Sequence, residues 1–162
     1  MRVKPVVNSI LKLGFRNETQ DLTHLKIQKL LYFLNGWYLA IHGEPVIDEP
    51  FEAWPYGPVV PSLYSDLKRY GASPIDEYLL EWDENSLQKK PFVISKENKD
   101  FWEVLNPVWE KYSVFSAKQL STMSHETNSP WDRTPQMLKI SNSLTRNYFL
   151  ALSKNREPVV IA

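Results

Sequence analysis

The stretch THLKIQKLLYFLNGWYLAI, residues 23–41, carries the clearest helical pattern in the sequence. Its apolar residues recur every three or four positions, as on one face of an α-helix, and Gly43 and Pro45 mark its end. Further apolar residues widen this stripe to most of the circumference, so we expect the helix to run through the middle of the fold. Lys26 and Lys29, at its start, are expected to stay in solvent. The apolar positions are Leu25, Ile27, Leu30, Leu31, Tyr32, Phe33, Leu34, Trp37, Tyr38, Leu39 and Ile41.

Shorter helices are predicted on both sides of this central one. Apolar residues recur at helical spacing from Val6, and Gly14 predicts an end near residue 13. Pro61 suits the first position of another helix and Gly71 its end. The inner face of that helix should carry Val60, Leu63, Tyr64, Leu67 and Tyr70.

The second half of the chain predicts three more helices. The apolar pattern of residues 101–112 predicts one with Ser95 as its cap, which Pro107 should kink or divide. Ser116 and Gln119 have the spacing of a capping box, which predicts a short helix before the loop of residues 126–135. A last helix should carry Leu144, Tyr148, Phe149 and Leu152.

Strand signals are brief. Residues 51–58, FEAWPYGP, read as a bent turn because Pro55 limits any strand to a short or edge position. Residues 78–82 and 91–94 favour a small hairpin around a polar connection. The sequence therefore predicts a mainly α fold, with a single compact domain of about five to six helices over residues 1–162 and a minor short β element at the margin of the α+β class.

Composition excludes several classes of protein. Nineteen basic residues balance nineteen acidic ones, which removes the broad positive field that attracts nucleic acid or anionic membranes. No cysteine is present, so disulfides and thiolate metal sites are excluded and a cytoplasmic location is expected. No stretch reaches the roughly 18 apolar residues of a membrane span. We therefore expect a protein without membrane or nucleic-acid partners.

The motifs of common enzymes are missing. HETNS, which begins at His125, lacks the second histidine of the zinc-protease motif because Ser129 occupies its place. The glycines do not cluster as phosphate-binding loops require, and no nucleophile elbow is present. We expect no catalytic residue, no metal and no cofactor. The alternative is an enzyme with a dispersed triad or with a pocket at His125 and Glu126.

AWPYGPVVP, residues 53–61, packs Trp, Tyr, Gly and three prolines into a stiff turn before a helix. Rigid amphipathic aromatic side chains contribute contact area at low entropic cost, so Trp54 and Tyr56 are candidates for partner contact, with Gly57 and Pro58 beside them. The alternative is that Trp54 covers the core and Tyr56 forms a local hydrogen bond.

Two further stretches could serve a partner. SHETNSPW, residues 124–131, offers His125, Pro130 and Trp131 in a loop, where function often lies. His125 could instead be a structural imidazole bonded to a backbone carbonyl, and Trp131 a plug at the end of the core. Lys26, Lys29 and Tyr32 could form a small basic surface, but three residues are too few to favour nucleic acid. A solvated helix start is the competing interpretation.

Three blocks together resemble the motifs of the Panacea domain, the SocA-like or phage-associated protein family. The blocks are KIQKLLYFLNGWYLAIHGEPV (26–46), FEAWPYGPVVPSLYSDLKRYG (51–71) and LSTMSHETNSPWDRT (120–134). Their order and spacing match, and the resemblance covers residues 5 to 150.

The resemblance implies an antitoxin that binds a small protein toxin encoded beside it. One branch of the family serves as an adaptor that delivers the toxin to a cytoplasmic protease, and phage members could bind a host defence or regulatory protein. Homo-oligomers are compatible with this picture. The family motifs fix no individual contact, so the residues named above remain candidates.

Overall fold

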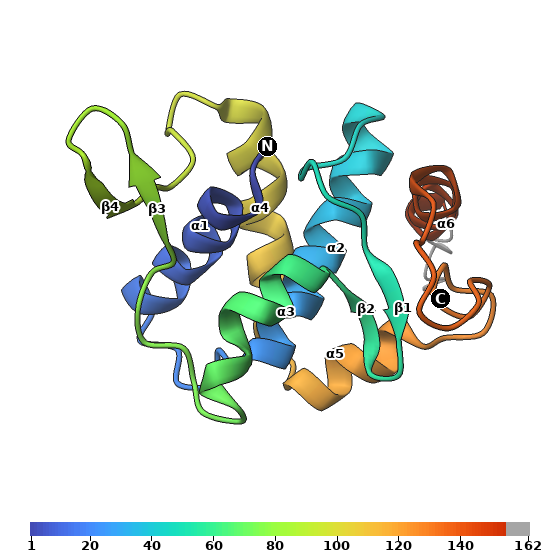
Figure 1. The fold of residues 1–162 in the computed structure, drawn as a ribbon. Coiled ribbons are helices and arrows are strands. Elements are labelled where there is room, and N and C mark those ends of the chain that lie inside the picture. Colours follow the sequence, from blue (N-terminus) through green and yellow to red (C-terminus); the bar gives the residue numbers. More distant parts are fainter. Residues whose placement is uncertain (155–162) are drawn as a thin grey trace, which may run out of the picture.

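The structure, a computed structural model, describes residues 1–154. That range contains six α-helices, one short 3₁₀ helix and two antiparallel two-stranded sheets, β1–β2 and β3–β4 (Figure 1). The predicted mainly α fold with a minor β element is confirmed. None of the helices within residues 1–154 is long and apolar enough to cross a membrane.

The central helix is α2 (His24–His42), as the pattern predicts. The Thr23 hydroxyl accepts a hydrogen bond from the Lys26 amide at its start, and Gly43 ends it in the left-handed conformation at φ 77°. Figure 1 shows α2 in the middle of the molecule, and it packs against α1, α3, α4, α5, α6 and β2. These neighbours explain why apolar residues surround most of the helix.

Helix α1 (Val3–Arg16) continues past Gly14, so its predicted end near residue 13 is wrong. A Cβ at Gly14 would lie 2.0 Å from Leu22 Cδ1. The glycine therefore allows close packing inside the helix and does not terminate it.

Helix α3 (Pro61–Leu67) begins with its proline as predicted and continues as the 3₁₀ helix η1 (Lys68–Tyr70), which Gly71 caps. Tyr64 was expected on the inner face but is 41% exposed. Its ring instead lies beside Trp54, with centroids 5.1 Å apart.

Helix α4 (Lys99–Tyr112) is one continuous element with Pro107 inside it, so the proline does not divide the helix. Its cap is Asn98, whose side chain accepts from the Phe101 amide, and the predicted Ser95 cap is wrong. Ser95 lies one turn too early, where its carbonyl oxygen accepts from the Asn98 amide. Helix α5 (Ala117–Ser124) starts with the predicted capping box of Ser116.

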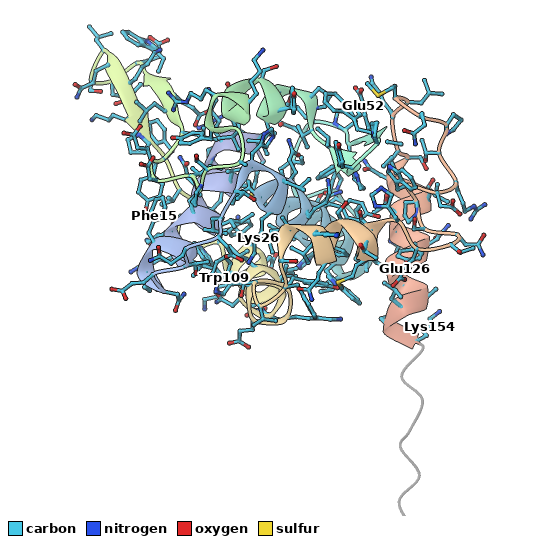
Figure 2. All side chains as sticks on the ribbon, turned by 90° about the horizontal axis from the view of Figure 1, so that it is seen from below. Phe15, Lys26, Glu52, Trp109, Glu126 and Lys154 are labelled. Atoms are coloured by element: carbon cyan, nitrogen blue, oxygen red, sulfur yellow. The ribbon has the colours of Figure 1, made fainter. Side chains whose placement is uncertain are left out.

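Helix α6 (Asn142–Lys154) packs against α2, and Figure 2 shows α6 at the side of the molecule with Lys154 labelled. Its buried Phe149 enters an aromatic cluster, and a second cluster member, Phe33, stacks on Tyr112 with ring centroids 4.3 Å apart. These rings join three helices into one core. The cluster comprises Tyr32, Phe33, Trp37, Phe51, Tyr112, Tyr148 and Phe149.

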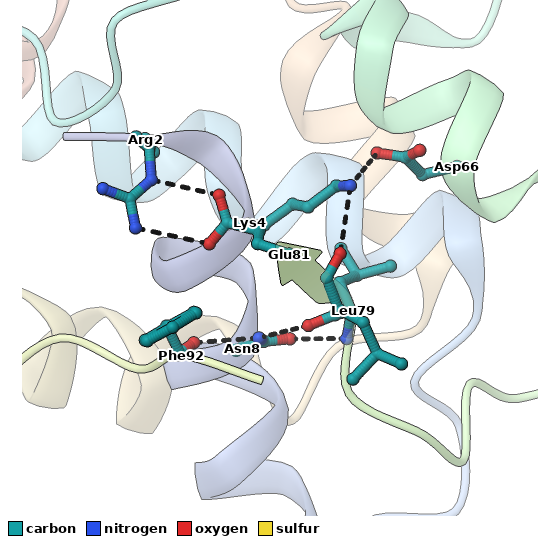
Figure 3. A network of polar contacts seen from close by, with 8 residues as sticks. Arg2, Lys4, Asn8, Asp66, Leu79, Glu81 and Phe92 are labelled. Atoms are coloured by element: carbon teal, nitrogen blue, oxygen red, sulfur yellow. Dashed lines mark hydrogen bonds and ion pairs between the residues drawn. The ribbon is translucent and has the colours of Figure 1, made fainter. Parts of the chain in front are cut away.

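The second hairpin, β3 (Leu80–Asp83) and β4 (Gln88–Pro91), projects from α1 at the edge of the molecule (Figure 1). Asn8 fixes its base, because its buried side chain donates to the carbonyl oxygens of Leu79 and Phe92 and accepts from the Leu79 amide, each at 2.8 Å (Figure 3). The ion pair between Arg2 and Glu81, at 3.0 Å, adds a surface contact. A hairpin is confirmed, with a first strand that begins two residues later and a second strand that begins three residues earlier than predicted.

Candidate functional site

The candidate site is built on the turn between β1 (Glu52–Trp54) and β2 (Gly57–Val59). Trp54 pairs with Gly57, so Pro55 and Tyr56 form the tip. Gly57 has φ 110°, a conformation that side chains with a Cβ rarely adopt. Tyr56 is 73% exposed and Trp54 is half-buried, so the turn presents two aromatic side chains at or near the surface.

Side chains at the end of α5 and in the loop after it bind the first half of the turn, residues 54 and 55. Trp131 Nε1 donates to the carbonyl oxygen of Trp54 at 2.6 Å, and His125 Nε2 lies 3.0 Å from the carbonyl oxygen of Pro55. Because Pro55 has no N–H, few backbone donors are available near this tip. Side chains therefore supply the missing donors.

Helices α5 and α2 hold the second half of the turn. Ser121 Oγ donates to the carbonyl oxygen of Tyr56 at 2.8 Å, and Lys29 Nζ donates to that of Pro58 at 2.8 Å. Four carbonyl groups of residues 54–58 are thus bound by four side chains from two separate parts of the chain. We call this arrangement the clamped turn: residues 54–58 with Lys29, Ser121, His125 and Trp131.

Gln28 fixes the chain where it leaves the hairpin. Its side-chain amide donates to the carbonyl oxygen of Val60 at 3.2 Å and accepts from the Val60 amide at 3.0 Å. Both residues are buried, so this pair of bonds satisfies backbone groups that water cannot reach. The exit from the turn is therefore as fixed as its tip.

Lys29 is the unusual member of the clamp, because its side chain is fully buried. Burial lowers the pKa of its ammonium group from 10.5 to about 7. A Cβ at Gly57 would lie 2.8 Å from Lys29 Cε and 2.6 Å from Ser124 Oγ, so only glycine fits between them. Gly57 and Pro58 are themselves buried, and we assign them to shaping the turn rather than to contact with a partner.

His125 links α5 to the turn. Its Nδ1 contacts the carbonyl oxygen of Ser121, and its ring lies against Trp131 with centroids 3.9 Å apart. These contacts agree with the structural interpretation of this histidine, an imidazole bonded to a backbone carbonyl, and contact of His125 with a partner stays a prediction. Within residues 1–154 no three His, Asp or Glu side chains are grouped as metal ligands.

A cavity of about 380 Å³ opens beside the clamped turn. His24 and Tyr64 face it, with ring centroids 5.2 Å apart, and burial lowers the pKa of His24, helped by the positive charge of Lys29. A neutral imidazole is a better neighbour for an apolar ligand than a charged imidazole would be. The lining residues are His24, Leu25, Gln28, Trp54, Pro55, Tyr56, Val59, Tyr64 and Gly71.

The predicted basic surface at the start of α2 does not exist. Lys26 is 1% exposed, and its ammonium group binds both carboxylate oxygens of Asp21 at 2.9 Å and the carbonyl oxygen of Ser113 at 2.6 Å. Lys29 and Tyr32 are equally buried, so the expectation that the helix start is solvated is wrong.

Pro130 is buried as well, whereas Trp54, Tyr56, His125 and Trp131 keep exposed surface. Sequence reasoning assigned no functional role to Gln28, Ser121 or Tyr64, and it placed Tyr64 only on the inner face of a helix. A glutamine inside an apolar helical stripe is a usable signal, since a buried polar side chain needs a hydrogen-bond partner. Ser121 and Tyr64 carry no comparable signal.

Comparison with known proteins places these residues in a family. The model for the antitoxin SocA-like Panacea domain matches residues 27–132, which span all four clamp residues. The chain is 33% identical over 112 residues to the antitoxin SocA of Caulobacter vibrioides (strain NA1000 / CB15N). That match covers 68% of this chain and 58% of the relative, so the chain spans little more than half of that protein. No solved structure matches the chain. The chain belongs to the Panacea domain family of SocA-like antitoxins.

Proposed function

We propose that this protein neutralises a protein toxin by direct, stoichiometric binding in the cytoplasm, with Trp54 and Tyr56 at the centre of the contact. The family supports the antitoxin role. The observation that supports the contact is the clamped turn, which fixes its backbone from the inside while Tyr56 stays 73% exposed.

Preorganisation favours binding at this turn. A loop that becomes ordered only on association loses conformational entropy, whereas a turn with bound carbonyl groups has little left to lose. Tyr and Trp are also the side chains most enriched among residues that dominate binding energy. The clamped turn therefore combines the usual anchor side chains with a rigid backbone.

The cavity beside the turn supplies the complementary half of the contact. An apolar side chain of the toxin would enter the cavity beside the paired rings of Trp54 and Tyr64, and surrounding contacts would complete an interface of about 1,200–2,000 Å². Such an interface blocks the toxin by covering its surface and requires no turnover. One antitoxin would therefore inactivate one toxin.

Co-expression with adjacently encoded proteins, followed by titration of the purified pair, tests the proposal. Tyr56→Ala should weaken the complex about thirtyfold, because truncating an anchor residue costs about 2 kcal/mol. Trp82→Ala is the matched control, since Trp82 is 53% exposed but lies on the other hairpin. Full affinity in both Tyr56→Ala and Trp54→Ala would refute the contact, and inhibition at substoichiometric amounts would indicate an enzyme.

Toxin abundance separates occlusion from delivery to a protease. Under occlusion the toxin accumulates in the complex at an undiminished level. A protease-dependent fall in toxin would favour the adaptor role instead. Recovery of a host defence or regulatory protein, with no adjacently encoded partner, would assign the protein to a mobile element. That residues 1–162 form one Panacea domain stays a prediction.

A further inference from the structure

A second pocket, of about 220 Å³, lies between α1 and the start of α4, away from the clamped turn. Phe15, which precedes Arg16 in α1, and Glu126, which follows His125, lie on opposite sides of the molecule in Figure 2. Three basic side chains converge on this pocket, although the chain as a whole has no net charge. The lining residues are Lys12, Leu13, Arg16, Lys96, Trp102 and Asn106.

The segment that carries Lys96 is fixed to both helices. The Ile94 amide donates to Ser9 Oγ of α1 at 2.9 Å, and Trp102 Nε1 of α4 donates to the carbonyl oxygen of Ser95 at 2.9 Å. The backbone just before the lysine is therefore held in place. Lys96 thus reaches the same pocket as Lys12 and Arg16 from a segment that both helices anchor.

The fold itself does not neutralise these charges. No carboxylate lines the pocket, and none of the three side chains forms an ion pair within 4.0 Å among residues 1–154. Lys12 and Arg16 are four residues apart on one helix, a spacing at which like charges destabilise the helix. The helix dipole favours Arg16 in the last turn of α1, but it does not explain Lys96, which lies outside the helix.

We propose that Lys12, Arg16 and Lys96 form a binding site for an oxyanion that carries about two negative charges. The planar guanidinium of Arg16 matches two oxygens of one phosphate or carboxylate group, and the two lysines supply point charges. The side-chain amide of Asn106 adds a donor, while Leu13 and Trp102 form an apolar wall. A phosphate group and neighbouring carboxylates of an acidic peptide share this chemistry.

Titration followed by ¹⁵N NMR, with the Trp102 indole N–H as reporter, tests the site. The probes are inorganic phosphate and a capped tetraglutamate peptide, each added to the full-length protein at low and at high salt. We expect saturable shifts at Trp102 that weaken as salt increases. Preference for phosphate would identify a free or esterified phosphate as the source, and preference for the peptide would identify an acidic protein segment.

Substitutions decide whether the pocket is responsible. Lys12→Ala, Arg16→Ala and Lys96→Ala should each weaken binding about fivefold, the scale of an exposed ion pair, and Arg16→Lys should restore only part of the loss. Lys118→Ala, an exposed lysine on α5, is the matched control and should change nothing. Absence of shifts with both probes, or equal losses in Lys118→Ala, would overturn the proposal. Toxin binding should be unchanged in these variants, so the two proposals fail independently.

Discussion

Gly36→Ala should destabilise the protein, although helix propensity alone predicts the reverse. Gly36 lies inside α2, where replacing glycine by alanine normally stabilises a helix by about 1 kcal/mol. In this fold a Cβ at residue 36 would lie 2.2 Å from Phe149 Cε2 and 2.3 Å from Cζ. Carbon atoms in contact lie about 3.5–4.0 Å apart, so the ring would have to move by more than about 1 Å.

The surroundings of Phe149 set the cost of that movement. The ring is fully buried, and its neighbours Trp37 and Tyr32 have ring centroids 5.2 Å and 5.8 Å away. Overpacking such a core costs about 1–3 kcal/mol, and loss of the buried ring would cost about 3–5 kcal/mol. After subtraction of the gain in propensity, we expect a net loss of about 2 kcal/mol in the free energy of unfolding.

A double-mutant cycle with Phe149→Ala makes the reasoning testable. Removing the ring removes the clash, so Gly36→Ala should stabilise the Phe149→Ala protein by up to about 1 kcal/mol. Urea unfolding followed by circular dichroism measures all four proteins, with equal m-values as the check for two-state behaviour. A stabilising Gly36→Ala in the wild-type background, or the same loss in both backgrounds, would refute the proposed packing of α6 on α2.

Two further predictions concern buried polar groups. The pKa of Lys29 is about 7 in the folded state and 10.5 when exposed, so between these values the unfolded state holds more protons and stability rises with pH. The free energy of unfolding should therefore increase by about 2 kcal/mol from pH 7 to pH 9. Urea titrations of Lys29→Met should not show this increase. The same pH dependence in Lys29→Met and in the wild-type protein would contradict the burial of the charge. The Tyr32 hydroxyl is buried without a partner among residues 1–154, so Tyr32→Phe should leave stability unchanged or raise it. Tyr112→Phe loses the hydrogen bond from Trp37 Nε1 at 2.9 Å, so it should lower the free energy of unfolding by about 1 kcal/mol. Thermal unfolding in which Tyr32→Phe is less stable than Tyr112→Phe would be inconsistent with these contacts.

The elements that the sequence predicted well are those specified by local signals. The Ser116 capping box and the Pro61 start involve residues within one helical turn of each other, so their spacing alone identifies them. Gly14 misled for the same reason. Its local meaning is a helix end, whereas its actual role depends on Leu22, which packs against it from the following loop. A glycine in a helical pattern can mark a helix end or a close packing contact, and only its neighbour in the folded structure distinguishes the two.

The candidate site was predictable in its aromatic residues and not in its support. A lysine near a helix start is expected in water, because burying a charge is costly unless it is paired. Lys26 has its pair in Asp21, but its second partner, the Ser113 carbonyl oxygen, lies at the end of α4. The partner of Lys29 is the carbonyl oxygen of Pro58. No periodicity relates such residues, so their burial follows only from the assembled fold.

The prolines of the turn explain why three distant blocks of sequence occur together. Pro55 and Pro58 stiffen the turn but have no N–H, so they donate nothing to the β-ladder, and the carbonyl groups of residues 54, 55, 56 and 58 meet side chains. Lys29 from one block, and Ser121, His125 and Trp131 from another, donate to those carbonyl groups or lie against them. The family match, residues 27–132, begins just before the first of these side chains and ends just after the last. The three blocks therefore contain the residues that hold the turn, and they do not identify a partner. In the proposed contact, selectivity for one partner comes from side chains that the clamp leaves free, such as Tyr56, which is 73% exposed.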